Sequence, residues 1–176
     1  AILDALRRRA AQTKPGEWVL GFKYDDTKTS DGRPLTLADL DAALPDHPVF
    51  VEHRGGHTAW VNTAALKAAH VDQNTPDPSG GKFDRDPATH QLTGRIRENA
   101  KTGFQQLIPS NFTRDDRRAG VKLISKMMSR TGVTSVTDAL GSPDNLRSYQ
   151  DARDSGDLSL RIYCHIYYTY MDHMLE

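Results

Sequence analysis

The order of elements expected in the second half of the chain constrains its fold most. Thr113 is placed to cap an amphipathic helix that runs to about Arg130, and a β-branched strand follows over 132–138. A second helix is expected near 144–155 and a second strand over 160–168. Helices that alternate with strands through short connections are typical of a parallel sheet, and so predict an α/β protein. The residues expected on the buried side of the first helix are Val121, Leu123, Ile124, Met127 and Met128.

The first half of the chain predicts a mixture of short helices and strands. Apolar residues recur at helical spacing over 2–10, and large residues alternate with small or polar ones over 17–24. Thr36, with Asp39 three residues later, predicts the start of a short helix with a capping box. The mostly apolar run 49–53 indicates a strand inside a sheet.

The next segments are expected to return the chain to the same sheet. Gly55 and Gly56 should turn the chain into a helix that runs from about Thr58 to Ala69. The stretch 72–87 holds prolines, glycines and aspartates, and is expected to be a long loop or a hairpin. A brief strand is expected over 93–98.

Charge and composition exclude several classes of protein. The 23 basic and 23 acidic side chains give a formal net charge of zero without a block of five like charges, so no nucleic-acid or membrane partner is expected. Cys164 is the only cysteine and cannot form an intramolecular disulfide, which favours a reducing, cytoplasmic location. No apolar run approaches the roughly 20 residues of a membrane span.

The run 48–66 is the most informative stretch for function. It predicts a buried strand that leads through two glycines to a helix whose first turns carry His57, Trp60 and Asn62. Loops after strands and the free amide groups of helix starts commonly meet ligands. Trp60 would form an apolar wall, and His57 and Asn62 would form directional hydrogen bonds. Capping and core packing are the alternative roles of these three residues.

His53, Asp138 and His165 are further polar residues within predicted strands. His53 and His57 stand four residues apart, but the two glycines between them break the helix that would aim both rings at one metal ion, so no metal ligand is predicted. Asp138 ends a predicted strand, where barrels hold their sites, and capping of the next loop is its alternative role. His165 is expected to be an inward-facing, packed histidine.

Four blocks of sequence together resemble a known family. They are "PGEWVLGFKYDD", "LTLADLDAALPDHPVFVEHRGGHTAWVNTAALKAA", "TPDPSGGKFDRDPATHQLTGRIRENA" and "GVTSVTDAL". In this order they resemble the amidohydrolase family that includes N-substituted formamide deformylases and many metal-dependent hydrolases with TIM barrels. The resemblance covers residues from about 3 to 170.

The resemblance implies a fold made of two parts. The family has a distorted (β/α)8 barrel, with an insertion after its first strand. By analogy, residues 1–100 are an α+β insertion domain, and residues 101–176 are a partial barrel of about two βα units, with a soft boundary at 100–112. "GVTSVTDAL" would be the second barrel strand and "LSLRIYCHIYY" the third.

The resemblance also implies that this chain lacks the catalytic metal ligands. The family binds zinc-type ions through a His-x-His pair on strand one and through residues on strands four, five, six and eight. None of these strands is expected here, and the sequence contains no His-x-His. The chain would therefore be an inactive piece of a hydrolase acting on amide-like, non-peptide C–N bonds. His57, Trp60 and Asn62 would shape its substrate pocket, and Glu98 would line it.

A free-standing α/β module that binds a small ligand without catalysis is the alternative. In that module the Gly55-Gly56 loop and Trp60 would hold the ligand. The two hypotheses differ in their sheets. A partial barrel would leave apolar strand edges open and would self-associate through them, whereas a complete module would be a monomer with a covered sheet.

Overall fold

The chain divides into two compact units. The computed structural model describes residues 1–109 and 112–170, and the units are Ala1–Pro109 and Ser110–Glu176. Residues 110 and 111, within the boundary expected at 100–112, lie outside the described part, so the division into an insertion domain and a barrel segment stays a prediction. Among the described residues, no helix has both the length and the apolar character needed to cross a bilayer.

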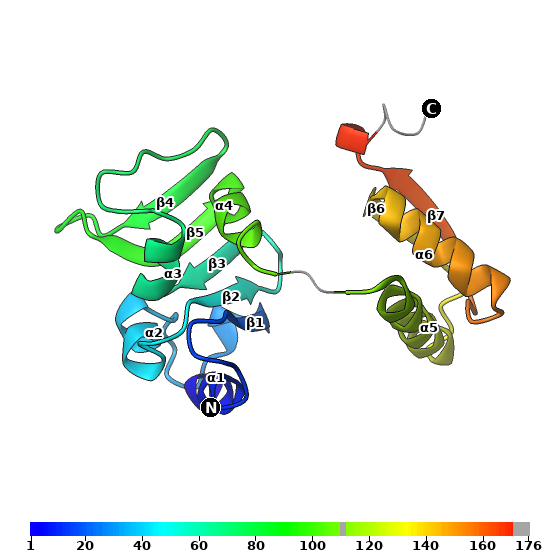
Figure 1. The fold of residues 1–176 in the computed structure, drawn as a ribbon, viewed down its shortest axis with the longest axis horizontal. Coiled ribbons are helices and arrows are strands. Elements are labelled where there is room, and N and C mark those ends of the chain that lie inside the picture. The colour runs from blue at the N-terminus through cyan, green and yellow to red at the C-terminus, as the bar shows by residue number, and fades with distance from the viewer. Residues whose placement is uncertain (110–111, 171–176) are drawn as a thin grey trace. The chain divides into compact units, whose positions relative to one another are not determined.

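The first unit is a five-stranded mixed sheet with short helices (Figure 1). Its elements are α1 (Ile2–Ala10), β1 (Val19–Tyr24), η1 (Asp26–Lys28), α2 (Leu37–Ala43), β2 (Val49–His53), β3 (Thr58–Val61), α3 (Thr63–Ala68), β4 (Gly81–Arg85), β5 (Leu92–Glu98), η2 (Asn99–Lys101) and α4 (Thr102–Gln105). The strand order is β1-β2-β3-β5-β4. Only β1 and β2 are parallel, and all other neighbours are antiparallel.

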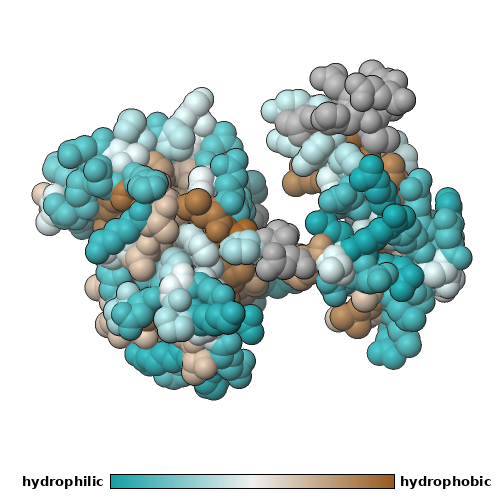
Figure 2. Space-filling model, viewed as in Figure 1, coloured by the Kyte–Doolittle hydropathy of each residue, from teal (hydrophilic) through white to brown (hydrophobic). Residues whose placement is uncertain are grey.

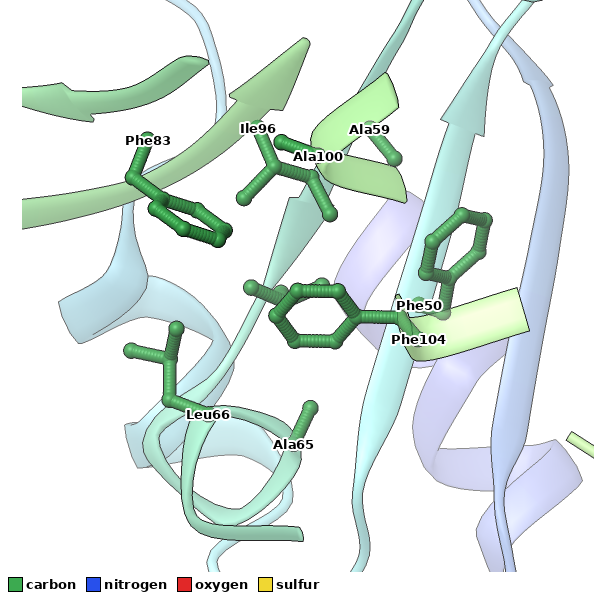
Figure 3. Close-up of a cluster of buried hydrophobic side chains, with 9 residues drawn as sticks. Phe50, Ala59, Ala65, Leu66, Phe83, Ile96, Ala100 and Phe104 are labelled. Carbon is green, nitrogen blue, oxygen red and sulfur yellow. The ribbon is translucent and has the colours of Figure 1, made fainter. Parts of the chain in front are cut away.

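Hydrophobic side chains pack on both faces of this sheet. Figure 3 shows one cluster, in which the rings of Phe50, Phe83 and Phe104 lie near Leu66 and Ile96. The cluster on the other face consists of Leu6, Val19, Tyr24, Leu40, Leu44, Val49, Val51 and Trp60. Because the strands between these clusters are buried on both sides, the sheet is the centre of the unit.

A capping box begins α2 as predicted. The Thr36 hydroxyl accepts a hydrogen bond from the Asp39 backbone N–H at 3.1 Å, and the Asp39 carboxylate accepts one from the Thr36 N–H at 3.0 Å. Arg33 donates to both carboxylate oxygens of Asp39 at 2.6 and 2.9 Å. The Arg33 guanidinium, followed by Thr36, holds the pKa of Asp39 well below its usual range.

We expect Asp39→Asn to lower the free energy of unfolding at neutral pH by about 0.5–2 kcal/mol. The free energy of unfolding of this variant should also fall less between neutral and acidic pH than that of the unmodified chain. A lowered carboxyl pKa contributes stability above the ordinary aspartate pKa, and this contribution is lost as pH falls through the lowered value. Urea unfolding between neutral and acidic pH measures both effects. Asp46→Asn, in the exposed turn before β2, is the control. If the free energy of unfolding fell equally steeply with falling pH in both variants, the prediction would be contradicted.

The predicted helix over 58–69 is wrong in its first part. Residues Thr58–Val61 form the buried strand β3, and α3 begins only at Thr63. β3 pairs with both β2 and β5, and Trp60 lies opposite Val51 on one side and Arg95 on the other. The sequence predicted a helix directly after the turn at Gly55 and Gly56, but two strands distant in sequence supply hydrogen-bond partners that override local preference.

The second unit alternates helix and strand as predicted. Its elements are α5 (Arg114–Arg130), β6 (Ser135–Gly141), α6 (Pro143–Asp154), β7 (Arg161–Ile166) and η3 (Tyr168–Tyr170). Thr113 caps α5 and forms a capping box with Asp116. β6 and β7 are parallel, so the predicted parallel pairing is confirmed.

The predicted burial of the α5 side chains is largely wrong. Val121 is buried, whereas Leu123, Ile124 and Met127 are exposed and Met128 is only partly covered. The described part of this unit pairs only two strands and has only two longer helices, α5 and α6, whereas parallel sheets normally have both faces covered by helices. Hydrophobic residues accordingly reach the surface of this unit in Figure 2.

Candidate functional site

Ionisable side chains gather at one edge of the first unit's sheet, where β1, β2 and β5 end and β3 begins. They are Asp25, Asp26, Glu52, His53, Arg54, His57, Glu98 and Lys101. In α/β sheets, ligands commonly bind beyond the carboxyl ends of strands. This edge is therefore the candidate functional site.

His57 and Glu98 form a pair at this edge. The His57 Nδ1 lies 3.0 Å from the Glu98 Oε2, and the Glu98 backbone N–H donates to the His57 carbonyl at 2.8 Å. The two side chains are 75% and 55% exposed. The structure thus brings together two of the residues predicted to form a substrate pocket, and it leaves both exposed.

Lys101 anchors the Gly55-Gly56 loop beside this pair. Its side chain is only 9% exposed, and its ammonium donates to the Glu52 Oε1 at 2.8 Å and to the Gly56 carbonyl. A buried charge is tolerated only when it is paired in this way. Lys101 could not be predicted from the sequence, because a lysine in a polar stretch is usually exposed and its partner Glu52 stands 49 residues away.

Asp25, Asp26 and His53 form the only group of potential metal ligands among the described residues, with candidate atoms within 4.8 Å of one another. The sequence predicted no metal ligand here. The Asp25 Oδ2, however, lies 3.3 Å from the Arg54 Nε and 3.7 Å from the Lys28 Nζ. Two cations therefore compete with a metal ion for this carboxylate, although the buried Asp25 Oδ2 accepts no hydrogen bond among the described residues.

Trp60 and Asn62 are buried in the core, in contrast to the exposed His57–Glu98 pair. Trp60 packs edge-on against Tyr24 at 4.8 Å between ring centroids, and the Arg95 guanidinium lies 5.5 Å from the centre of its ring. Asn62 is completely buried and caps α3. The sequence predicted both residues on the first turns of a helix, but Trp60 lies on β3 and only Asn62, as the N-cap, adjoins a helix. The alternative roles of core packing and capping are thus observed for Trp60 and Asn62 respectively. Their contact with substrate stays a prediction.

Asp138 in the second unit makes local hydrogen bonds. Its carboxylate accepts from the Tyr149 hydroxyl at 2.7 Å, the Asn145 amide at 3.2 Å and the Leu140 N–H at 3.1 Å. Burial opposes ionisation, but these three donors outweigh it and lower the pKa of Asp138. The contacts with Tyr149 and Asn145 join β6 to α6, and the contact with Leu140 is of the capping kind considered from the sequence.

His165 is exposed, so the prediction of a packed histidine is wrong within the described residues. Its ring meets that of Tyr163 edge-on at 4.8 Å. Side chains alternate across a strand, and Cys164 between these two residues is half-buried. Tyr163 and His165 therefore share the open face of β7.

Comparison with known proteins gives one consistent family. Residues 1–175 match the model of the amidohydrolase family. The chain is 26% identical over 160 residues to N-substituted formamide deformylase of Arthrobacter pascens, covering 89% of this chain and 29% of that protein. It is 35% identical over 120 residues to the exoenzymes regulatory protein AepA of Pectobacterium carotovorum, covering 67% of this chain and 25% of AepA.

A solved structure has the same fold. An uncharacterized metal-dependent hydrolase from Pyrococcus horikoshii superposes with a TM-score of 0.58 at 24% identity, covering 98% of this chain and 32% of that protein. The chain thus spans less than a third of the length of each of these proteins.

Proposed function

The chain belongs to the amidohydrolase family, and we propose that it is one piece of a metal-dependent hydrolase that cleaves non-peptide C–N bonds in small amide-like substrates. The family match over residues 1–175 and the fold shared with a metal-dependent hydrolase support a hydrolase. The likeness to an N-substituted formamide deformylase supports the choice of bond.

In this proposal the second unit supplies two βα units of a (β/α)8 barrel, and residues 1–100 are an α+β insertion domain. The parallel strands β6 and β7, with α6 between them, are the repeating unit of such a barrel. The exposed Leu140, Tyr163 and Tyr168 support the proposal, because a closed barrel and its loops would cover such side chains. The same open surface would let the isolated chain self-associate, and it argues against a free-standing binding module.

The catalytic ion, zinc or a similar divalent metal, would be held by segments outside this chain. When bound, such an ion lowers the pKa of its water and polarises a carbonyl group. The chain alone would be inactive. Its own contribution would be the exposed His57–Glu98 pair, which is the observation that carries this part of the proposal. His57 would hydrogen-bond the substrate, and Lys101 would hold the adjoining loop in place.

We expect His57→Ala in a complete hydrolase that contains this chain to lower kcat/KM by about 10-fold, the effect of losing one hydrogen bond to the substrate, with little change in melting temperature. The reason is that the ring is exposed and contributes little to packing. Steady-state kinetics with an N-substituted formamide measures the effect. His90→Ala, in the exposed turn between β4 and β5, is the matched control.

Unchanged kcat/KM in the His57 variant would remove His57 from the substrate pocket. Hydrolysis of an amide by the isolated 176-residue chain, with or without zinc, would contradict the proposal that the catalytic metal ligands lie elsewhere.

A further inference from the structure

Glu98 has a backbone conformation that normally belongs to glycine. Its φ is +50° and its ψ is −128°, which matches the first central position of a type II′ turn. Side chains other than glycine are strained there. Three other non-glycine residues have positive φ, namely Lys23, His70 and His90. Glu98 is the one that also takes part in the candidate site.

The path of the chain explains the turn but not the glutamate. The backbone leaves β5 at Glu98 and then passes close to Gly81. A Cβ atom added to Gly81 would collide with the Ala100 backbone nitrogen. The chain must therefore bend sharply, and glycine at position 98 would allow the bend without strain. Position 98 nevertheless carries a glutamate side chain, although its backbone conformation favours glycine.

Stability does not account for this side chain. The described contact of the Glu98 carboxylate is with the His57 Nδ1 at 3.0 Å, and both groups are more than half exposed. Exposed ion pairs contribute less to stability than such backbone strain costs. Strain that is not offset by local contacts is typical of positions kept for function.

The contact fixes where His57 carries its proton. An ionised carboxylate only accepts hydrogen bonds, so the neutral imidazole must donate from Nδ1. Its Nε2 then carries a lone pair and has no partner among the described residues. A neighbour that holds one ring nitrogen in this way sets the role of the other.

We propose that Glu98 is a positioning residue that holds His57 as the Nδ1–H tautomer, so that its Nε2 accepts a hydrogen bond from the N–H group of a ligand. The choice of an amide-like ligand rests on the proposed function, whereas the tautomer does not. The ring is 75% exposed, so such a group can reach the Nε2.

The test uses the 176-residue chain labelled with 15N at histidine, and reads the His57 ring nitrogens by NMR at alkaline pH, where imidazole is neutral. In the unmodified chain we expect the Nδ1–H form in several-fold excess. Glu98→Gln should abolish this excess, because an amide can donate to Nδ1 as well as accept from it. Glu98→Gly should abolish it too, and should raise the melting temperature by about 2–6 °C through relief of strain.

His70→Gly is the matched control, because it places glycine at another position of positive φ, just after the C-cap of α3. It should leave the His57 tautomer unchanged. Three results would overturn the proposal: an excess of Nε2–H in the unmodified chain, an unaltered tautomer in Glu98→Gln, or a lower melting temperature in Glu98→Gly. None of these measurements uses a substrate. A negative result here would therefore not contradict the hydrolase proposal. Conversely, unchanged kinetics of His57→Ala would not contradict the proposed tautomer.

Discussion

Replacing Asn62 with alanine is expected to lower the free energy of unfolding of the first unit by about 3–5 kcal/mol. The Asn62 side chain is completely buried and makes four hydrogen bonds. Its Oδ1 accepts from the Val49 N–H at 2.9 Å and the Ala65 N–H at 3.0 Å, and its Nδ2 donates to the Leu44 carbonyl at 3.0 Å and the His47 carbonyl at 2.8 Å. Alanine would leave buried backbone groups without partners and remove the cap of α3.

Chemical denaturation of the chain, followed by circular dichroism, measures this loss. The control is Asn99→Ala, since Asn99 is exposed and its side chain donates a hydrogen bond to the Ser79 carbonyl at 3.0 Å. We expect the control to cost less than about 1 kcal/mol. If the two variants were equally stable, the network around Asn62 would not be the link between β2 and α3 that the structure indicates.

Trp60→Ala is expected to cost about 3–5 kcal/mol, because it deletes a large buried aromatic side chain. Trp60 is 2% exposed and lies in β3, at the centre of the strand order. Its removal would take away the edge-on contact with Tyr24 and the surface beneath Arg95. The substitution would leave a cavity in the cluster that Trp60 forms with Leu6 of α1 and Leu40 of α2.

The melting temperature of Trp60→Ala, compared with that of Phe22→Ala, measures this effect. Phe22 is an exposed aromatic residue on the edge strand β1, so its removal should change stability little. A Trp60 variant that keeps its stability while the complete hydrolase loses substrate affinity would favour the pocket role suggested by the sequence over the packing role.

The sequence alone determined the features that depend on neighbours within a few residues. Thr36 with Asp39, and Thr113 with Asp116, form the capping boxes that begin α2 and α5. Only the first of these boxes was predicted in full. The strands near 49–53 and 93–98 and the helix–strand alternation of the second unit also follow from local periodicity. The four ordered sequence blocks were sufficient to identify the family.

Only the tertiary structure decided which distant residues meet. Residues 58–61 become a strand because β2 and β5 supply hydrogen-bond partners on both sides. His57 reaches Glu98 across 41 residues, and a sequence pattern carries no register between segments so far apart. The physical reason is that hydrogen bonds within one turn depend on spacing along the chain, whereas contacts between strands depend on how the sheet is assembled.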